Sequence, residues 1–169
     1  TNTDQIIVYL VTPRSGMCAG DNFTVTITVH PKPSIMPQVA TICSGTAFVV
    51  NPVNTGINIV PAGTTYTWTI LNDNNNIVGQ SDVSVSSNTV SQVLTNTTNQ
   101  SQTITYQVAP TSGAAGGCVG NNFLVHITVT PKPFVADQQT EICSGSTFSV
   151  VPANGNGNIV PGGTLYSWT

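Results

Sequence analysis

Charged residues are scarce in this sequence, at 5% of its 169 residues, where about a quarter is usual in globular domains. The net charge is −3, and the three basic residues form no cluster. We therefore expect neither nucleic acid nor an anionic membrane as a partner. No run approaches the 18 or so apolar residues of a membrane-spanning helix, and no long stretch has helical apolar spacing, so we expect no membrane insertion.

What the chain does contain favours β-structure. Hydrophobic residues make up 39% of it, which is enough for a packed core, and the polar remainder is rich in Thr, Asn and Ser. Threonine, valine and isoleucine favour strands, while asparagine, serine, glycine and proline favour the turns between them. The composition therefore predicts an all-β fold.

The chain is organised by a repeat. Phe23–Val29, Pro31–Pro33 and Ile42–Gly45 return almost unchanged one hundred residues later as 123–129, 131–133 and 142–145. Such a period indicates a tandem array, of which we interpret this chain as a segment. We predict the C-terminal strands of one repeat at 1–33, a complete repeat at 34–133 and the N-terminal strands of the next at 134–169.

Within the complete repeat, about seven short strands separated by turn signals predict an antiparallel immunoglobulin-like β-sandwich. In the closing strand the alternate residues from Phe123 to Val129 match those from Phe23 to Val29, while the other face varies between copies. The candidate core residues are Tyr66, Trp68, Tyr106 and Phe123. Each copy then ends in Pro-Lys-Pro (Pro31, Lys32, Pro33; Pro131, Lys132, Pro133), which predicts a short, stiff inter-domain joint because proline fixes its own backbone.

Nothing in the sequence predicts catalysis or a cofactor. Asp73, in the asparagine-rich turn 72–76, could offer oxygen to Ca²⁺, but calcium prefers several carboxylates, so we favour a polar turn. His30 becomes Thr130 in the other copy, and His126 replaces Thr26, so we interpret both histidines as surface residues. Ser44 has no partner for a nucleophilic site. We expect no enzyme, no catalytic or cofactor-binding residues and no metal site.

The four cysteines Cys18, Cys43, Cys118 and Cys143 occupy repeated positions and suggest an oxidising compartment. A Cys43–Cys118 bond would close a loop of about 75 residues, worth roughly 4–5 kcal/mol. In a simple sandwich, however, these two residues lie nominally at opposite ends. Bonds within a repeat, bonds between repeats and free thiols therefore all stay open.

Several short motifs resemble the PKD-like, immunoglobulin-like repeats of giant cell-surface proteins of Bacteroidota, including gliding-motility-type adhesins. The matching stretches are Ile42–Gly45, Tyr66–Trp68, Leu94–Asn96, Thr105–Pro110, Gly117–Gly120 and Ile127–Pro133. The third strand departs from PKD domains proper in lacking an acidic-Gly turn after its tryptophan. The resemblance implies type IX secretion, an extracellular place at the bacterial surface and a role in adhesion or gliding, and it brings no catalytic residues.

Our first functional hypothesis is thus a structural stalk. Its expected partners are neighbouring repeats of the same chain, together with other copies in a fibre or the surface-anchoring or motility machinery. The alternatives are a ligand- or glycan-binding module, using loops 51–63 or 72–76, and an accessory domain beside an enzyme.

Overall fold

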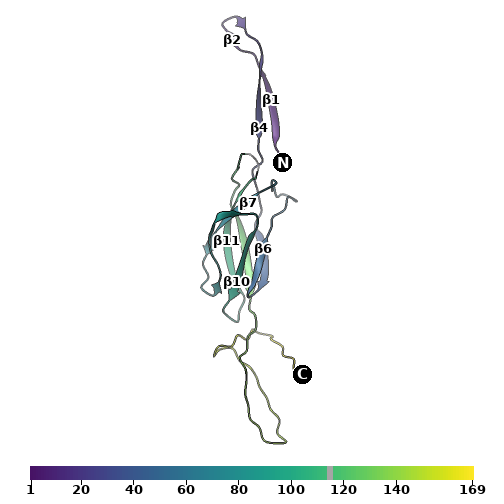
Figure 1. The fold of residues 1–169 in the computed structure, drawn as a ribbon, viewed down its shortest axis with the longest axis vertical. Helices are drawn as coiled ribbons and strands as arrows, with labels where there is room; N and C mark the ends of the chain where they lie inside the picture. Colours follow the sequence, from purple (N-terminus) through teal and green to yellow (C-terminus); the bar gives the residue numbers. More distant parts are fainter. Residues whose placement is uncertain (114–115) are drawn as a thin grey trace.

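A computed structural model describes residues 1–113 and 116–169, and these residues contain only strands, turns and irregular segments. Three parts follow one another along the long axis of the molecule (Figure 1). A narrow hairpin is at one end, a β-sandwich is in the middle, and an irregular segment is at the other end. The hairpin lies within residues 1–33, the sandwich within 34–133 and the irregular segment within 134–169.

The sandwich consists of eight strands in two sheets. They are β5 (Gln38–Cys43), β6 (Thr46–Val50), β7 (Thr65–Asn72), β8 (Ile77–Val78), β9 (Val83–Ser87), β10 (Val90–Asn96), β11 (Gln102–Thr111) and β12 (Phe123–Thr130). One sheet has the order β5-β12-β11-β7-β9 and the other β6-β10-β8. The predicted all-β, immunoglobulin-like sandwich is confirmed.

One strand pair in the sandwich is parallel. β5 lies beside β12 with six residues in register, from Gln38 against Val125 to Cys43 against Thr130, whereas the other strand pairs of both sheets are antiparallel. The chain turns at Ser44–Gly45 into β6 of the opposite sheet. The parallel pairing of β5 with β12 departs from the purely antiparallel arrangement that the sequence pattern predicted.

The core forms between the sheets where the alternating residues meet. Tyr66, Trp68, Tyr106 and Phe123 are all buried, with exposed fractions of 0–4%. Tyr106 packs on Phe48 with ring centroids 5.6 Å apart, and Tyr66 meets Phe123 edge to face at 6.2 Å, geometries that aromatic rings prefer. Burial raises the pKa of both tyrosine hydroxyls, because the phenolate form loses its hydration.

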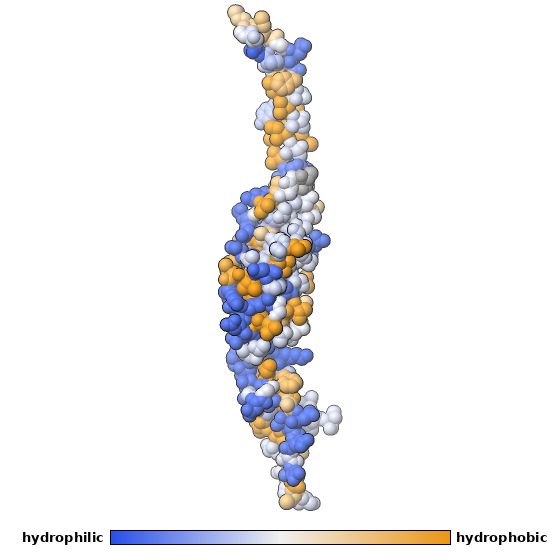
Figure 2. All heavy atoms as spheres, turned by 60° about the vertical axis from the view of Figure 1, so that its left-hand side comes forward, coloured by the Kyte–Doolittle hydropathy of each residue, from blue (hydrophilic) through white to orange (hydrophobic). Residues whose placement is uncertain are grey.

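The first part is a hairpin of β1 (Gln5–Val11) and β4 (Phe23–Val29), closed by the small pair β2 (Arg14–Ser15) and β3 (Cys18–Ala19). It repeats the β11–β12 pair, but none of residues 1–113 and 116–169 covers its apolar face as the second sheet covers that of β11 and β12. Phe23 is 50% exposed where Phe123 is 3% exposed, and apolar residues are visible along the narrow end of the molecule (Figure 2). The expected inward face of this strand is therefore not buried here.

The third part corrects an expectation. Residues 134–169 were expected to form N-terminal strands, but they contain only isolated bridges, Phe134–Ile159 and Gly155–Asn158. The physical reason lies in the pairing of the complete repeat: β5 is held by β12, β6 by β10, and β7 by β11 and β9. Residues 134–169 correspond to 34–69, so those partner strands have no counterpart among them. Trp168 is accordingly 87% exposed.

Candidate functional site

The segment Pro31–Pro33 joins the hairpin to the sandwich, and a loop of the sandwich shields its two prolines from solvent. Pro31 and Pro33 are buried, while Lys32 between them is exposed. The loop that leads from β11 to β12 covers them: a Cβ placed on Gly120 would lie 2.5 Å from the Pro33 carbonyl oxygen. Lys32 Nζ donates to Asn121 Oδ1 at 3.1 Å. The Pro-Lys-Pro segment is thus packed into the following domain.

His30 belongs to this joint, which corrects its predicted place on the open surface. Its side chain is 24% exposed, and its Nδ1 lies 3.0 Å from Asp4 Oδ1. The other side of the ring meets the covering loop, since a Cβ placed on Gly116 would lie 2.8 Å from His30 Cδ2. Any side chain at Gly116 would have to displace the ring. His126, on the outer face of the five-stranded sheet, is also partly buried by neighbouring side chains. Thr105 Oγ1 lies 2.9 Å from its Nδ1.

The joint below the sandwich has the same sequence but is open. Pro131 is half-exposed, and Lys132 and Pro133 are exposed. A groove runs between the end of the sandwich and residues 134 and 159, lined by Cys43, Ser44, Gly45, Thr46, Thr95, Asn96, Lys132, Pro133, Phe134 and Ile159. Residues 134–169 correspond to 34–69 and therefore include no counterpart of the loop that covers the upper joint.

Asn96 holds the lower end of the sandwich together. Its side chain is 2% exposed, and its Nδ2 donates to the carbonyl oxygens of Gln100 at 2.7 Å and Val129 at 2.9 Å. Its backbone exchanges hydrogen bonds with the Ser44 hydroxyl, which donates to the Asn96 carbonyl and accepts from its amide. This network ties the turn after β5 to the ends of β10 and β12. Ser44 thus has a structural role.

The cysteines lie at the ends of the domains. Cys43 ends β5 beside Thr130, at the lower end of the sandwich, whereas Cys118 lies in the loop before Phe123, at the upper end. The eight residues of β12 separate these ends by roughly 26 Å at about 3.3 Å per residue, so the structure does not bring Cys43 and Cys118 together. Cys18 lies in the hairpin tip and Cys143 in the third part, and all four thiols are free.

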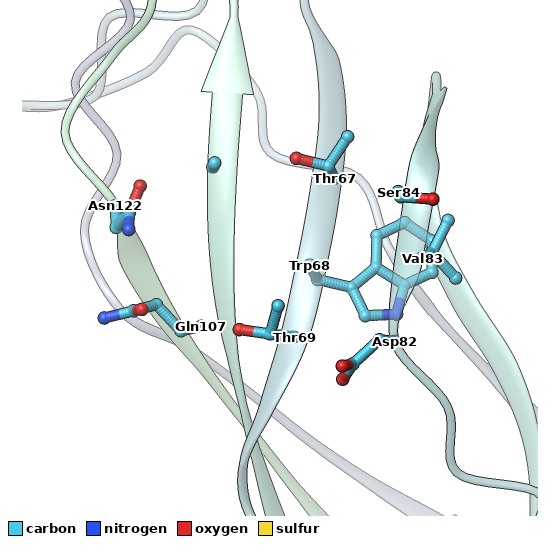
Figure 3. Close-up of a pocket in the computed structure, with 9 residues that line it drawn as sticks. Thr67, Trp68, Thr69, Asp82, Val83, Ser84, Gln107 and Asn122 are labelled. Atoms are coloured by element: carbon cyan, nitrogen blue, oxygen red, sulfur yellow. The ribbon is translucent and has the colours of Figure 1, made fainter.

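A shallow hollow on the five-stranded sheet is also lined by polar groups. Figure 3 shows Thr67, Thr69, Gln107 and Asn122 around it, with the Trp68 indole and Asp82 at the β9 side. The Trp68 indole nitrogen is buried and has no hydrogen-bond partner among the residues that the structure describes. Asp82 accepts from the Ile70 amide at 2.7 Å, near the register shift between β7 and β9. The hollow provides single hydrogen-bonding groups and no acid–base pair.

The asparagine-rich turn behaves as a self-capped turn. Asn74 Oδ1 accepts from the Asn76 amide at 3.1 Å, and Asp73 accepts from the side chain of Gln80. Among residues 1–113 and 116–169, no three His, Cys, Asp or Glu residues are close enough together to hold a metal ion.

The family follows from a comparison of the whole chain with protein families. A model described as PKD-like domain matches residues 1–33 and 40–133. The chain belongs to the PKD-like domain family. The two matched ranges are the hairpin and the sandwich, so the hairpin is related to the second half of a PKD-like domain. Among curated proteins, none matches the chain.

Membership of the PKD-like family indicates general properties of the chain. PKD-like domains are usually extracellular and typically non-catalytic modules with an immunoglobulin-like sandwich. In the part of the chain that the structure describes, no helix is long and apolar enough to cross a membrane. We therefore take the joint at Pro31–Pro33, with its defined contacts to the covering loop, as the candidate functional site of this PKD-like chain.

The sequence predicted a joint at Pro-Lys-Pro, but sequence reasoning missed the loop that covers Pro31 and Pro33. A signal was present in the sequence, since Gly20 and Gly120 occupy the same place in both copies. In the structure each of them lies against a proline side chain, that of Pro13 or Pro110. A glycine retained in a loop marks a close approach of backbones. Which backbone approaches Gly120 could not be read from the sequence, because the contact joins two domains.

Proposed function

We propose that this PKD-like chain is part of a stalk, in which stiff domains joined end to end hold an adhesive or motile surface element away from the cell. The observation that carries the proposal is the closed joint, in which Pro31 and Pro33 are buried under the loop of the next domain. A flexible linker would leave such residues solvated. A packed joint instead fixes the direction in which one domain follows another.

The topology of the sandwich supports a load-bearing role. The chain enters at Ser34, at the upper end, and leaves at Pro133, at the lower end, through the adjacent strands β5 and β12. Because these strands are parallel, tension along the chain pulls them past each other. The hydrogen bonds across the six paired residues must then break together, and forced unfolding is governed by the height of that barrier.

The setting of the stalk rests on the resemblance to repeats of giant Bacteroidota surface proteins. We propose export by type IX secretion and display at the bacterial surface, in adhesion or gliding. The composition supports an exposed position, since only three residues are Lys or Arg, and Lys32 and Lys132 each precede a proline. Such a chain offers few sites to proteases that cleave after basic residues.

We expect the hairpin and the sandwich to reorient as one body in solution. Residual dipolar couplings of the amides of β4 and β12 should fit a single alignment tensor in the full chain. In the double variant Pro31→Gly/Pro33→Gly, the couplings of β4 and those of β12 should require two different tensors. The reason is that the joint loses its fixed φ angles and its packing.

The matched control changes Pro131→Gly and Pro133→Gly in the open lower joint, which should leave the couplings of β4 and β12 unchanged. Two independent tensors in the unaltered chain would show freely moving domains and would contradict the stalk.

A further inference from the structure

We propose that the two cysteines of each repeat form disulfides across the joints, so that Cys43 bonds to the residue of the following repeat that corresponds to Cys118. Each complete repeat has one cysteine at either end. Each joint would then receive one sulfur from the domain above and one from the domain below. The inference rests on the arrangement of the repeats and does not require that the stalk carries load.

At the lower joint, Cys43 lies beside Thr130. Their Cα atoms are partners in the parallel register of β5 and β12, one position beyond the pair Ile42 and Val129. Val129 is fully buried and Ile42 packs against the core. Because side chains alternate along strands, Cys43 and Thr130 both point away from the core, on the outer face of the five-stranded sheet. Cys43 is exposed there and lines the open groove.

At the upper joint, Cys118 approaches the equivalent place from the other domain. His30 occupies the position of Thr130 in the earlier copy. A Cβ placed on Gly116 would lie 2.8 Å from the His30 ring and 3.4 Å from Cys118 Sγ. The Cys118 sulfur is therefore held within one side chain's reach of residue 30. The Ser112 amide donates to the Cys118 carbonyl at 3.0 Å, which fixes this part of the loop.

The repeat allows the two joints to be superposed. In a complete domain above the sandwich, the counterpart of Cys43 would lie beside His30, on the outer face, as Cys43 lies beside Thr130. Cys118 reaches residue 30 from below. In a complete domain below, the counterpart of Cys118 would fill the groove in which Cys43 is exposed. The two sulfurs would then meet at one place in the joint, and a disulfide there requires their Cα atoms to lie within about 7 Å of each other.

The same geometry argues against a bond within the repeat, because β12 separates Cys43 from Cys118 by its whole length. In the proposed step both S–H bonds break and one S–S bond forms. The two protons and two electrons pass to a disulfide oxidant, which is reduced to two thiols; oxidised glutathione or a disulfide oxidoreductase supplies this chemistry outside the cytosol.

The test supplies the missing half of the joint. The full chain is extended after Thr169 by a second copy of residues 70–133, which completes the third repeat because 134–169 corresponds to 34–69. After folding with oxidised glutathione, digestion with pepsin under non-reducing conditions should give one linked pair, the Cys43 peptide with the peptide of the appended Cys118 copy. Cys43→Ser should abolish this pair, and Cys143→Ser should leave it intact.

A second variant needs no added repeat. His30→Cys in the unextended chain should bond to Cys118, since the new thiol stands where the covering loop arrives, while Thr28→Cys, on the same face of β4 but away from the loop, should stay reduced. A free Cys43 in the extended chain, a Cys43–Cys118 bond in either chain, or a His30→Cys variant that does not bond to Cys118 would each overturn the proposal.

Discussion

Trp68→Ala should destabilise the sandwich by about 3–5 kcal/mol, the usual range for removing a large buried aromatic side chain. Trp68 is 4% exposed and lies on β7, between β11 and β9 in the five-stranded sheet. Its removal leaves a cavity that rigid neighbouring strands cannot fill. Urea unfolding followed by far-ultraviolet circular dichroism measures the change, and the slope of the transition should stay the same.

The chain contains its own matched control. Trp168 occupies the same place in the repeat as Trp68 but is 87% exposed, so Trp168→Ala should leave the transition of the sandwich unchanged within about 0.5 kcal/mol. Equal losses from the two substitutions would mean that the third part packs against a core, in conflict with the described fold.

Asn96→Asp should destabilise the protein by about 3 kcal/mol or more at neutral pH. The substitution keeps the shape of the side chain but places an oxygen where Nδ2 now donates to the carbonyls of Gln100 and Val129. Two acceptors then lose their donor, and a buried carboxylate faces them, which combines the costs of unsatisfied hydrogen bonds and of an unpaired charge.

The pH dependence of this variant has a definite sign. Burial favours the neutral form of the introduced carboxyl, so its folded pKa lies above the unfolded value of about 4. The stability of the variant relative to the parent should therefore rise as the pH falls from 7 toward 4, where the protonated group can donate to one carbonyl. Thermal unfolding across this range measures it. Asn88→Asp, at an exposed position, should show neither effect.

The sequence predicted the sandwich well because its signals are local. Alternation in Phe123–Val129 marks one buried face, and Tyr66 and Trp68 mark another, since burial on one side of a sheet imposes a period of two. The same alternation recurs in Phe23–Val29, where the structure leaves it exposed, and the strands predicted within 134–169 are absent from those residues. A strand pattern states which face would be buried; whether it is buried depends on partner strands far away in the chain.

The joint was predictable in part. The stiffness expected of Pro-Lys-Pro depends only on the three residues Pro31–Pro33, so it could be predicted from the local sequence. The closure of the joint depends on Gly116, Gly120 and Asn121, about 90 residues away, and no local rule connects them. The same distance hid the role of His30, which looked like a casual surface substitution and lies between Asp4 and the covering loop.

The most direct test of a load-bearing stalk is to pull the sandwich in two directions in single-molecule force spectroscopy. Handles at Ser34 and Pro133, at opposite ends, load β5 and β12 in shear. Handles at Gly45 and Pro133, at the same end, peel the same strands apart one hydrogen bond at a time. Our account predicts a several-fold higher unfolding force in the first direction. Equal forces would contradict it, because the parallel pair would then not resist tension along the chain.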